Sequence, residues 1–318
     1  MNSGTADDNE LPSEFLVRLQ EIYGPRARDV VASMQSEKRP CIWLNPLVGE
    51  AAHTFAALVD LGVALEPLGW MPETYLSHAR DREGLVRSAV FTQGAIYLQN
   101  ASSLLASRML APQPGEEVLD LAAAPGGKTI QLAAMMENRG RLAAVESVKG
   151  RFFRMRANLE RAGVCNAVTY LMDGRSVGRK TPGRFQRVLL DAPCSSEARF
   201  RVTDPGSYGH WSLKKVRECA RKQRGLIASA LEALVSGGRL LYCTCAFSPE
   251  ENELVVQHAL ERFEGSVAVL PIEVPIPNVS PGLAEWRGTA LDARLAKAVR
   301  VIPDEAFDGF FMCLLEKR

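Results

Sequence analysis

The chain has 318 residues, of which 47% are hydrophobic and 24% are charged, with a formal net charge of +1 at pH 7. This composition is ordinary for a soluble globular protein, and the length allows a full α/β core with one small extra domain. No segment approaches the roughly 18 uninterrupted apolar residues of a membrane span. The seven cysteines are odd in number and scattered, which favours reduced thiols in the cytoplasm over a disulfide framework.

The first part of the chain predicts a tail and a small mixed domain. Residues 1–10 are polar and acidic, unlike a secretory signal, and we expect a disordered tail there. Pro12 opens a helix that Gly24 ends, and Gly62 ends a second one. We therefore expect an α+β domain over residues 11–112, with helices at 12–23 and 51–61 and strands at 41–45, 65–70 and 90–98.

From residue 113 to 318, strand-like and helix-like segments alternate. Such alternation predicts an α/β fold with a Rossmann-like, mostly parallel sheet whose faces are covered by helices. The segment 270–281 is rich in Pro and Val and predicts an irregular insertion or edge. The predicted strands are 116–121, 141–146, 168–172, 187–191, 239–243 and 309–315, and the predicted helices are 128–136, 150–162, 214–234 and 250–263.

A Gly-rich turn, DLAAAPGGKT at 120–129, follows the first of these strands. Glycines there let a ligand approach the backbone, and the start of the helix offers free N–H groups. The P-loop pattern fails because Ala122 stands where it requires glycine, and the dinucleotide spacing is absent too. Glu146 and Asp173 end the next two strands, where acids can reach a ribose hydroxyl and an adenine amino group. These features suit a cofactor with a nucleoside but no phosphate, such as S-adenosylmethionine.

Two cysteines each follow a strand-like run: Cys194 in DAPCS at 191–195, and Cys245 in YCTC at 242–245. The ends of parallel strands face one crevice, so we expect the Gly-rich turn, Asp191 and both thiols to meet there. A thiolate that adds to carbon 6 of a pyrimidine makes carbon 5 electron-rich enough to accept a methyl group. Asp191 could hydrogen-bond the ring, and the second thiol could assist release of the product.

The other cysteines have a plainer interpretation. We expect Cys41, Cys165, Cys219 and Cys313 to be core fillers, and Cys243 to point away into the sheet. No metal site is expected, because the Cys-x-Cys has no partner pair and the four histidines are dispersed.

Two stretches, residues 139–187 and 199–224, are rich in Lys and Arg. Clustered cations can neutralise phosphates, although each cluster alone is equally typical of a solvated helix face. Their position around the thiol motifs favours a surface that faces RNA.

At these motifs the sequence resembles the Nol1/Nop2/Sun family of RNA 5-methylcytosine methyltransferases, which includes bacterial rRNA enzymes. The DAPCS motif and Thr244-Cys245 carry the resemblance, and further matches are DLAAAPGGKT, PEEN at 249–252, GFF at 309–311 and a spaced run from Phe91 to Ser103. The resemblance implies a class I methyltransferase sheet with an antiparallel last strand. It also implies an S-adenosylmethionine-dependent catalytic domain at 113–318 and an RNA-binding or support domain at 11–112.

The resemblance further implies roles for single residues. Cys245 would attack carbon 6 of a cytosine in rRNA or tRNA, Cys194 would assist product release, and Asp191 would hold the base. The residues alone leave the order of the two thiols open, because DNA 5-methylcytosine enzymes use a Pro-Cys nucleophile, the position of Cys194. The expected S-adenosylmethionine-binding residues are Ala122, Ala123, Ala124, Pro125, Gly126, Gly127, Lys128, Glu146, Arg151, Asp173 and Asp191.

The chain departs from the family pattern at Ala246, where Ser or Thr is frequent, at Ser196, where Gly is usual, and at IWLN 42–45, where many members have Arg-x-Asn. These differences concern RNA docking more than the core chemistry. We expect a monomer, with a second RNA-binding protein or a pre-formed ribonucleoprotein as an aid to docking. Two alternatives remain: a methyltransferase of the same fold that acts on DNA or protein, and an inactive RNA-binding scaffold.

Overall fold

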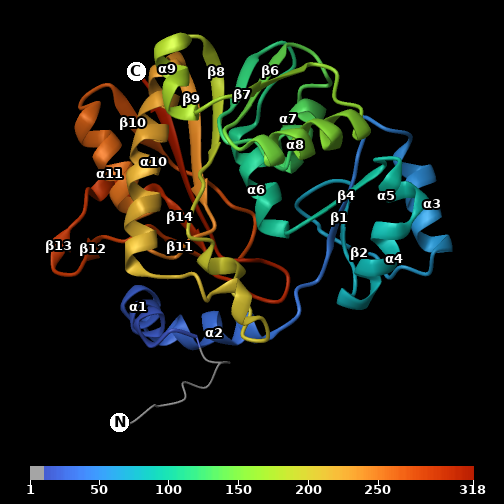
Figure 1. Ribbon diagram of the computed structural model, residues 1–318, viewed down its shortest axis with the longest axis horizontal. Helices are drawn as coiled ribbons and strands as arrows, with labels where there is room; N and C mark the ends of the chain where they lie inside the picture. Colours follow the sequence, from blue (N-terminus) through green and yellow to red (C-terminus); the bar gives the residue numbers. More distant parts are fainter. Residues whose placement is uncertain (1–10) are drawn as a thin grey trace.

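The computed structural model describes residues 11–318, so the tail expected at 1–10 lies outside the described residues. A large sheet with flanking helices forms most of the molecule, and a small lobe stands beside it (Figure 1). Within residues 11–318, no helix is long and apolar enough to cross a membrane.

Nine strands form the large sheet: β5 (Glu117–Asp120), β6 (Arg141–Glu146), β7 (Ala167–Leu171), β8 (Phe185–Asp191), β9 (Leu234–Thr244), β10 (Val267–Leu270), β11 (Val279–Pro281), β14 (Val299–Val301) and β15 (Phe310–Lys317). Their order is β11-β14-β15-β9-β8-β5-β6-β7, and β10 pairs with β15. The strands β5 to β9 pair in parallel, whereas β15 is antiparallel to β9. The expected methyltransferase sheet with an antiparallel last strand is confirmed.

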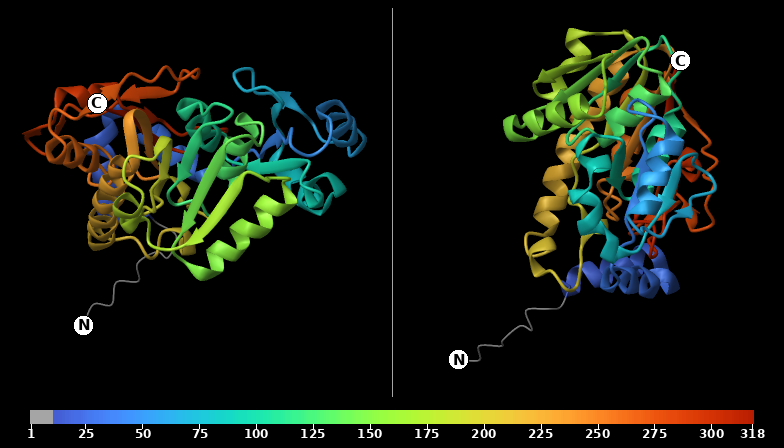
Figure 2. Two further views of the ribbon diagram at one scale, coloured as in Figure 1. Left: turned by 90° about the horizontal axis from the view of Figure 1, so that it is seen from above. Right: turned by 90° about the vertical axis from the view of Figure 1, so that its right-hand side faces the viewer.

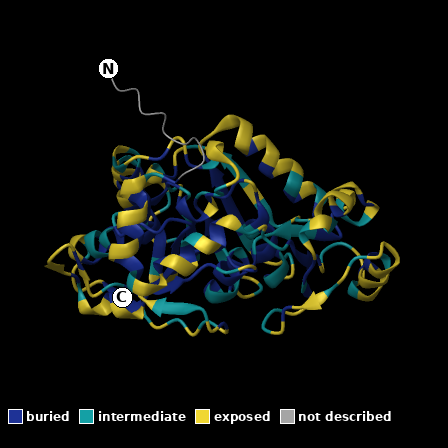
Figure 3. Cartoon of the chain, turned by 90° about the horizontal axis from the view of Figure 1, so that it is seen from below, coloured by how far each residue is buried: buried dark blue, intermediate teal, exposed yellow. Residues whose placement is uncertain are grey.

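Six helices accompany this sheet: α6 (Ala101–Leu110), α7 (Gly127–Met135), α8 (Lys149–Arg161), α9 (Val177–Lys180), α10 (Leu213–Ala233) and α11 (Glu253–Arg262). Three successive residues of β8, 188–190, are fully buried. Because neighbouring side chains of a strand point to opposite faces, this pattern requires both faces to be covered. The further views show helices on both sides of the sheet (Figure 2), and burial concentrates on the strands between them (Figure 3).

The small lobe contains an antiparallel sheet in the order β2-β3-β1-β4, with a small core of its own. That core includes Ile42, Leu58 and Leu85, one from a strand and two from helices. The elements of the lobe are β1 (Cys41–Leu44), β2 (Glu66–Pro67), β3 (Thr74–Leu76), β4 (Ile96–Gln99), α3 (Ala51–Asp60), α4 (Arg82–Arg87) and α5 (Ala89–Thr92).

The first two helices, α1 (Ser13–Tyr23) and α2 (Ala27–Gln35), do not belong to this lobe. They lie beneath α10 and β11 (Figure 1), and their buried side chains join the main core. The ring of Phe15 in α1 lies 5.1 Å from that of Phe200 and 5.5 Å from that of Trp211. The helix α6 likewise contacts α7, β8 and β9. A short hairpin is formed by β12 (Glu285–Trp286) and β13 (Thr289–Ala290).

Two local predictions are wrong. The strand expected at 90–98 begins only at Ile96, because α5 occupies Ala89–Thr92 and Gly94 turns the chain at a φ of 81°. The strand expected at 239–243 begins earlier, at Leu234, directly after the last residue of α10. Gly94 thus separates a short helix from the first strand, and the second strand runs through the glycines at 237 and 238 that were expected to precede it.

Candidate active site

Three neighbouring parallel strands end at one edge of the large sheet. The strand β5 ends at Asp120, β8 at Asp191 and β9 at Thr244, and Asp191 pairs directly with Cys243. The loops that follow line one cavity of about 690 Å³, which matches the crevice expected at the carboxyl ends of parallel strands. Of the residues predicted for the site, those in the lining are Ala122, Ala123, Ala124, Pro125, Gly127, Lys128, Arg151, Asp191, Cys194 and Cys245.

The Gly-rich turn has no room for a side chain at its second glycine. A Cβ atom on Gly127 would lie 2.7 Å from Cε1 of Tyr97, a residue of the small lobe that lines the same cavity. Gly126 precedes α7 with a φ of 108°, a left-handed conformation that favours glycine. Arg151 donates from Nη2 to the carbonyl of Ala124 at 2.8 Å and so fastens α8 to the turn.

Glu146 and Asp173 do not line the cavity. The carboxylate of Glu146 is buried and accepts from the backbone N–H groups of Ser147 and Val148 at 2.8 Å. Asp173 accepts from the side chain and the backbone N–H of Arg175, and this pairing holds the pKa of its carboxyl below the usual value. The roles expected for these two acids toward a nucleoside therefore stay predictions.

The sulfurs of Cys194 and Cys245 lie 3.3 Å apart. The hydrogen bond from Cys194, aided by the charge of Arg199, lowers the pKa of Cys245 to about 7. The same contact, together with burial, raises the pKa of Cys194 well above its ordinary value. The pair is thus polarised: Cys245 is the more acidic of the two thiols, and Cys194 lies where it can donate to the Cys245 sulfur. The roles that the resemblance implies for the two thiols stay predictions.

Asp191 lies beside the thiols and is paired with a cation. Lys128 donates from Nζ to Oδ2 of Asp191 at 2.7 Å and so fixes this oxygen at the cavity wall. The sulfur of Cys243 lies 3.8 Å from Oδ1 of the same carboxylate. Cys243 is fully buried and does not line the cavity.

The other cysteines divide as follows. Cys41, Cys219 and Cys313 are buried, as expected of core fillers, but Cys165 is exposed in the turn after α8, and that prediction is wrong. Among residues 11–318, no cluster of three or more His, Cys, Asp or Glu side chains is arranged to hold a metal ion.

Two residues of the site were not singled out from the sequence. Asp120 is buried, accepts from Thr129 through Oδ2 at 2.7 Å, and lines the cavity with an Oδ1 that has no hydrogen-bond partner within the protein. Burial raises the pKa of this carboxyl to about 7. Arg199 lines the cavity near the thiols. Asp120 could have been found as the last residue of its strand, whereas Arg199 belongs to the basic stretch at 199–224, which pointed to no single residue.

Comparisons with known proteins agree with this geometry. Residues 107–316 match the family described as 16S rRNA methyltransferase RsmB/F, and residues 11–101 match the N-terminal domain of 16S rRNA methyltransferase RsmF. The chain is 36% identical over 281 residues to the ribosomal RNA small subunit methyltransferase F of Cronobacter sakazakii, covering 86% of this chain and 58% of that protein. The corresponding protein of Vibrio atlanticus is 37% identical, with 86% of this chain and 59% of that protein covered.

Solved structures extend the likeness to the whole fold. A methyltransferase homolog from Pyrococcus horikoshii is 30% identical, with a TM-score of 0.84 and full coverage of both chains. The fold is also shared by NSun6 from the same organism, solved with SFG, at 22% identity, a TM-score of 0.81 and coverage of 96% and 98%. The chain spans a little under three fifths of the curated relatives' length, 58% in the first case. The resemblance noted in the sequence is confirmed, and the chain belongs to the 16S rRNA methyltransferase RsmB/F family.

Proposed function

We propose that this chain transfers a methyl group from S-adenosylmethionine to carbon 5 of a cytosine in ribosomal RNA, through a covalent bond between Cys245 and carbon 6. The observation that carries the proposal is the polarised pair of thiols, 3.3 Å apart, beside the Asp191 carboxylate. An inactive RNA-binding scaffold has no use for a thiolate held in this way. A target in DNA or protein finds no support in the family's relatives, which are named for ribosomal RNA.

The residues of the cavity fit the proposed cofactor. The Gly126–Gly127 turn leaves backbone N–H groups open at the start of α7, and Oδ1 of Asp120 is a buried acceptor without a protein partner. An acceptor of this kind suits the cationic end of S-adenosylmethionine. The cavity of about 690 Å³ lies within the usual size of a ligand site. When bound, the cofactor would supply an electrophilic methyl group.

The chain's own residues would handle the cytosine. The sulfur of Cys245 forms a bond to carbon 6, and the electron pair of the ring's C5–C6 double bond becomes available at carbon 5. Asp191 accepts a hydrogen bond from the exocyclic amine and so orients the ring for attack. These steps need a thiolate, which the lowered pKa of Cys245 supplies near neutral pH.

Release of the methylated base requires the proton on carbon 5 to leave. Once Cys245 is bonded to carbon 6, its negative charge no longer raises the pKa of Cys194. Cys194 can then lose its own proton to solvent and accept the proton of carbon 5. The S–C6 bond breaks, the ring double bond re-forms, and the electron pair returns to Cys245.

An RNA substrate is supported by the charge of the cavity. The lining includes five cationic residues and only two acids, Asp120 and Asp191. Neither Arg82 of α4 nor Arg154 of α8 makes a strong ion pair among the described residues, and they come from the small lobe and the large sheet respectively. Cations on both parts favour a polyanion that crosses between them. We therefore assign RNA support to the small lobe. The cationic residues of the lining are Arg82, Lys128, Arg151, Arg154 and Arg199.

The proposal is tested with two single variants. Cys245→Ala should abolish methyl transfer to small-subunit ribosomal RNA while leaving S-adenosylmethionine binding intact. Cys194→Ala should still attack carbon 6 but release slowly, and so accumulate a protein–RNA adduct, seen as a slow band on a denaturing gel. Bisulfite sequencing of the RNA product locates the cytosine. Adduct accumulation by Cys245→Ala, with a silent Cys194→Ala, would reverse the roles; activity in both variants would overturn the proposal.

A further inference from the structure

The loop that carries Cys194 is held by a buried carboxylate from the other thiol's loop. Ser195, which follows Cys194, donates its backbone N–H to Oε2 of Glu251 at 2.9 Å and its hydroxyl to Oε1. Gln223 of α10 donates to the same Oε2 at 2.9 Å and to the carbonyl of Pro193 at 2.9 Å. Glu251 is fully buried. The backbone on both sides of Cys194 is therefore tied to one side-chain network.

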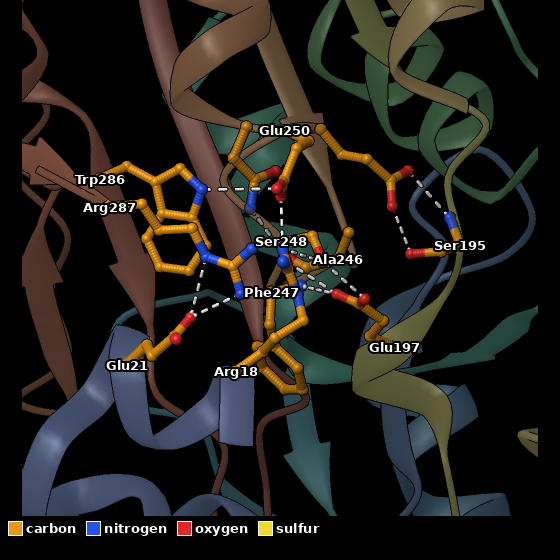
Figure 4. Close-up of polar contacts among 12 residues, drawn as sticks. Arg18, Glu21, Ser195, Glu197, Ala246, Phe247, Ser248, Glu250, Trp286 and Arg287 are labelled. Atoms are coloured by element: carbon orange, nitrogen blue, oxygen red, sulfur yellow. Dashed lines mark hydrogen bonds and ion pairs between the residues drawn. The ribbon is translucent and has the colours of Figure 1, made fainter. Parts of the chain in front are cut away.

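The loop that carries Cys245 is held in the same way from the opposite direction. The backbone N–H groups of Phe247 and Ser248 donate to Oε2 of Glu197 at 2.7 and 2.8 Å, and the hydroxyl of Ser248 donates to Oε1 at 2.7 Å. Glu197 follows Cys194 closely in the chain and is also buried. Trp211 completes its partners with a bond from Nε1 at 2.8 Å. Figure 4 shows Glu197 against Phe247 and Ser248, and Ser195 held beyond it.

The contacts are thus reciprocal. Each of the two loops contributes the acid that accepts hydrogen bonds from the backbone N–H groups of the other loop. We name this arrangement the carboxylate clasp, consisting of Glu197, Glu251 and the donors on Ser195, Phe247 and Ser248. We propose that Glu197 and Glu251 are positioning residues that hold the sulfurs of Cys194 and Cys245 within reach of each other. The catalytic meaning of the clasp rests on the proposed function, but its geometry does not.

The free-energy cost of burying two acidic side chains supports a positioning role for them. A buried carboxylate stabilises a fold no better than a well-packed apolar side chain would, even when it is paired. Here both acids accept from backbone N–H groups, and the directionality of these hydrogen bonds fixes the orientation as well as the distance of a loop. One further bond acts directly across the pair: the N–H of Ala198 donates to the carbonyl of Cys245 at 3.0 Å. All these contacts converge on the segments on either side of the sulfurs.

The helix α1 supports the Cys245 side of the clasp. Its Arg18, only 2% exposed, donates to the hydroxyl of Ser248 at 3.4 Å and pairs with Glu250 at 2.5 Å. Glu250 also accepts from Nε1 of Trp286 at 3.4 Å. Figure 4 shows this chain of contacts running from α1 to Ser248. The first helix therefore reaches the active site through the clasp, although it lies far from the cysteines in the sequence.

The distance between the sulfurs can be tested by oxidation without RNA or cofactor. Diamide removes two protons and two electrons from a pair of thiols, which then form one S–S bond, while the reagent is reduced to the hydrazine. The rate at which Cys194 and Cys245 become linked, followed by mass spectrometry of the digested protein, reports how often the two sulfurs meet. We expect Glu251→Gln and Glu197→Gln each to slow this linkage about tenfold or more, since small misplacements have large effects on such reactions.

The matched control is Glu116→Gln, which changes a carboxylate at the opposite edge of the sheet, paired with Arg187. It should leave the linkage rate unchanged. If a clasp variant fails to fold, Ser195→Ala provides the test instead. It removes the hydroxyl donor to Glu251 but retains the backbone N–H bond. The rate of linkage should then fall by a smaller factor. A folded clasp variant, or Ser195→Ala alone, that links the two cysteines at the wild-type rate would overturn the inference.

Steady-state kinetics provide a second measurement, which distinguishes misplaced sulfurs from a disrupted fold. The clasp variants should lose kcat while the KM for RNA stays near its wild-type value, because none of the clasp residues lines the cavity. If Cys245→Ala retains methyl transfer while the clasp variants slow the linkage, then the proposed function fails and the clasp stands.

Discussion

The two edges of the large sheet differ in how far their ionisable side chains are buried. At the carboxyl ends of β5, β8 and β9, ionisable side chains are buried, and Asp120, Glu251 and Cys245 have shifted pKa values. At the opposite edge, Glu117 pairs with Arg184 on the surface, where each side chain is about one third exposed. Buried ionisable groups are costly, and this molecule confines many of them to the side where the strands open into the cavity. The contrast marks the functional edge independently of any motif.

The largest effect is expected at the Gly-rich turn. Gly127→Ala would place a Cβ 2.7 Å from Tyr97, so the ring must move within the cavity wall. We expect S-adenosylmethionine binding to weaken by about tenfold or more, since such overpacking costs roughly 1–3 kcal/mol. Calorimetric titration with the cofactor measures this. The control is Gly150→Ala in α8, where a Cβ meets open space and binding should be unchanged; equal affinities for both variants would contradict the account.

An intermediate effect is expected in the pH dependence of stability. Burial raises the pKa of Asp120 to about 7 and that of Glu251 to about 8, the latter with help from the charge of Glu197. The folded state therefore retains protons that the unfolded chain has lost, and stability must fall as the pH rises from about 5 to about 8. The lowered pKa of Cys245 acts in the opposite direction only from about pH 7 upward.

Thermal unfolding across this pH range checks the sign. The wild type should lose Tm as the pH rises, and Glu251→Gln should show a shallower slope because one of the two titrating groups is gone. A Tm that climbs steadily from pH 5 to pH 8 would show that these acids are ionised in the folded protein at neutral pH.

The smallest effect is expected at the opposite edge. Glu117→Gln removes the surface pair with Arg184, which holds the pKa of that carboxyl below its usual value. Partly exposed pairs contribute little, so we expect a change of about 0.5 kcal/mol or less in the free energy of unfolding and unchanged methyl transfer. Chemical denaturation measures the first and a methyl-transfer assay the second. Loss of methyl transfer in Glu117→Gln would contradict the claim that only the edge with the cavity is functional.

Much of the fold was predictable because its signals are local. Alternating apolar segments located most elements of the large sheet, and β6 was predicted with its observed bounds, Arg141–Glu146. In the first part of the chain, Gly24 and Gly62 marked the ends of α1 and α3. The convergence of Asp191, Cys194 and Cys245 followed from the rule that parallel strands end at one crevice. The structure adds the distances and the polarity of the thiols.

The rest of the site depends on contacts between distant parts of the chain. Glu251 stands in the PEEN match and Glu197 in no motif, and no local pattern says that each will accept N–H groups from the other's loop. Ser196 illustrates a different limit: the family's glycine is readable as a departure, but only the structure shows its left-handed φ of 61°, which explains why glycine is usual there. Similarly, a chain order of α1 before β1 gives no hint that Phe15 of α1 packs against Phe200 and Trp211.

The most direct test of the account is the pH dependence of Cys245 alkylation by iodoacetamide, with each labelled cysteine identified by mass spectrometry. Because only the thiolate reacts, the rate at Cys245 should rise with a midpoint near pH 7, ahead of Cys194. In Cys194→Ala, the midpoint should shift upward because the donating thiol is gone. A wild-type midpoint at the ordinary cysteine value of about 8.5, or preferential labelling of Cys194, would contradict the assignment of Cys245 as the nucleophile.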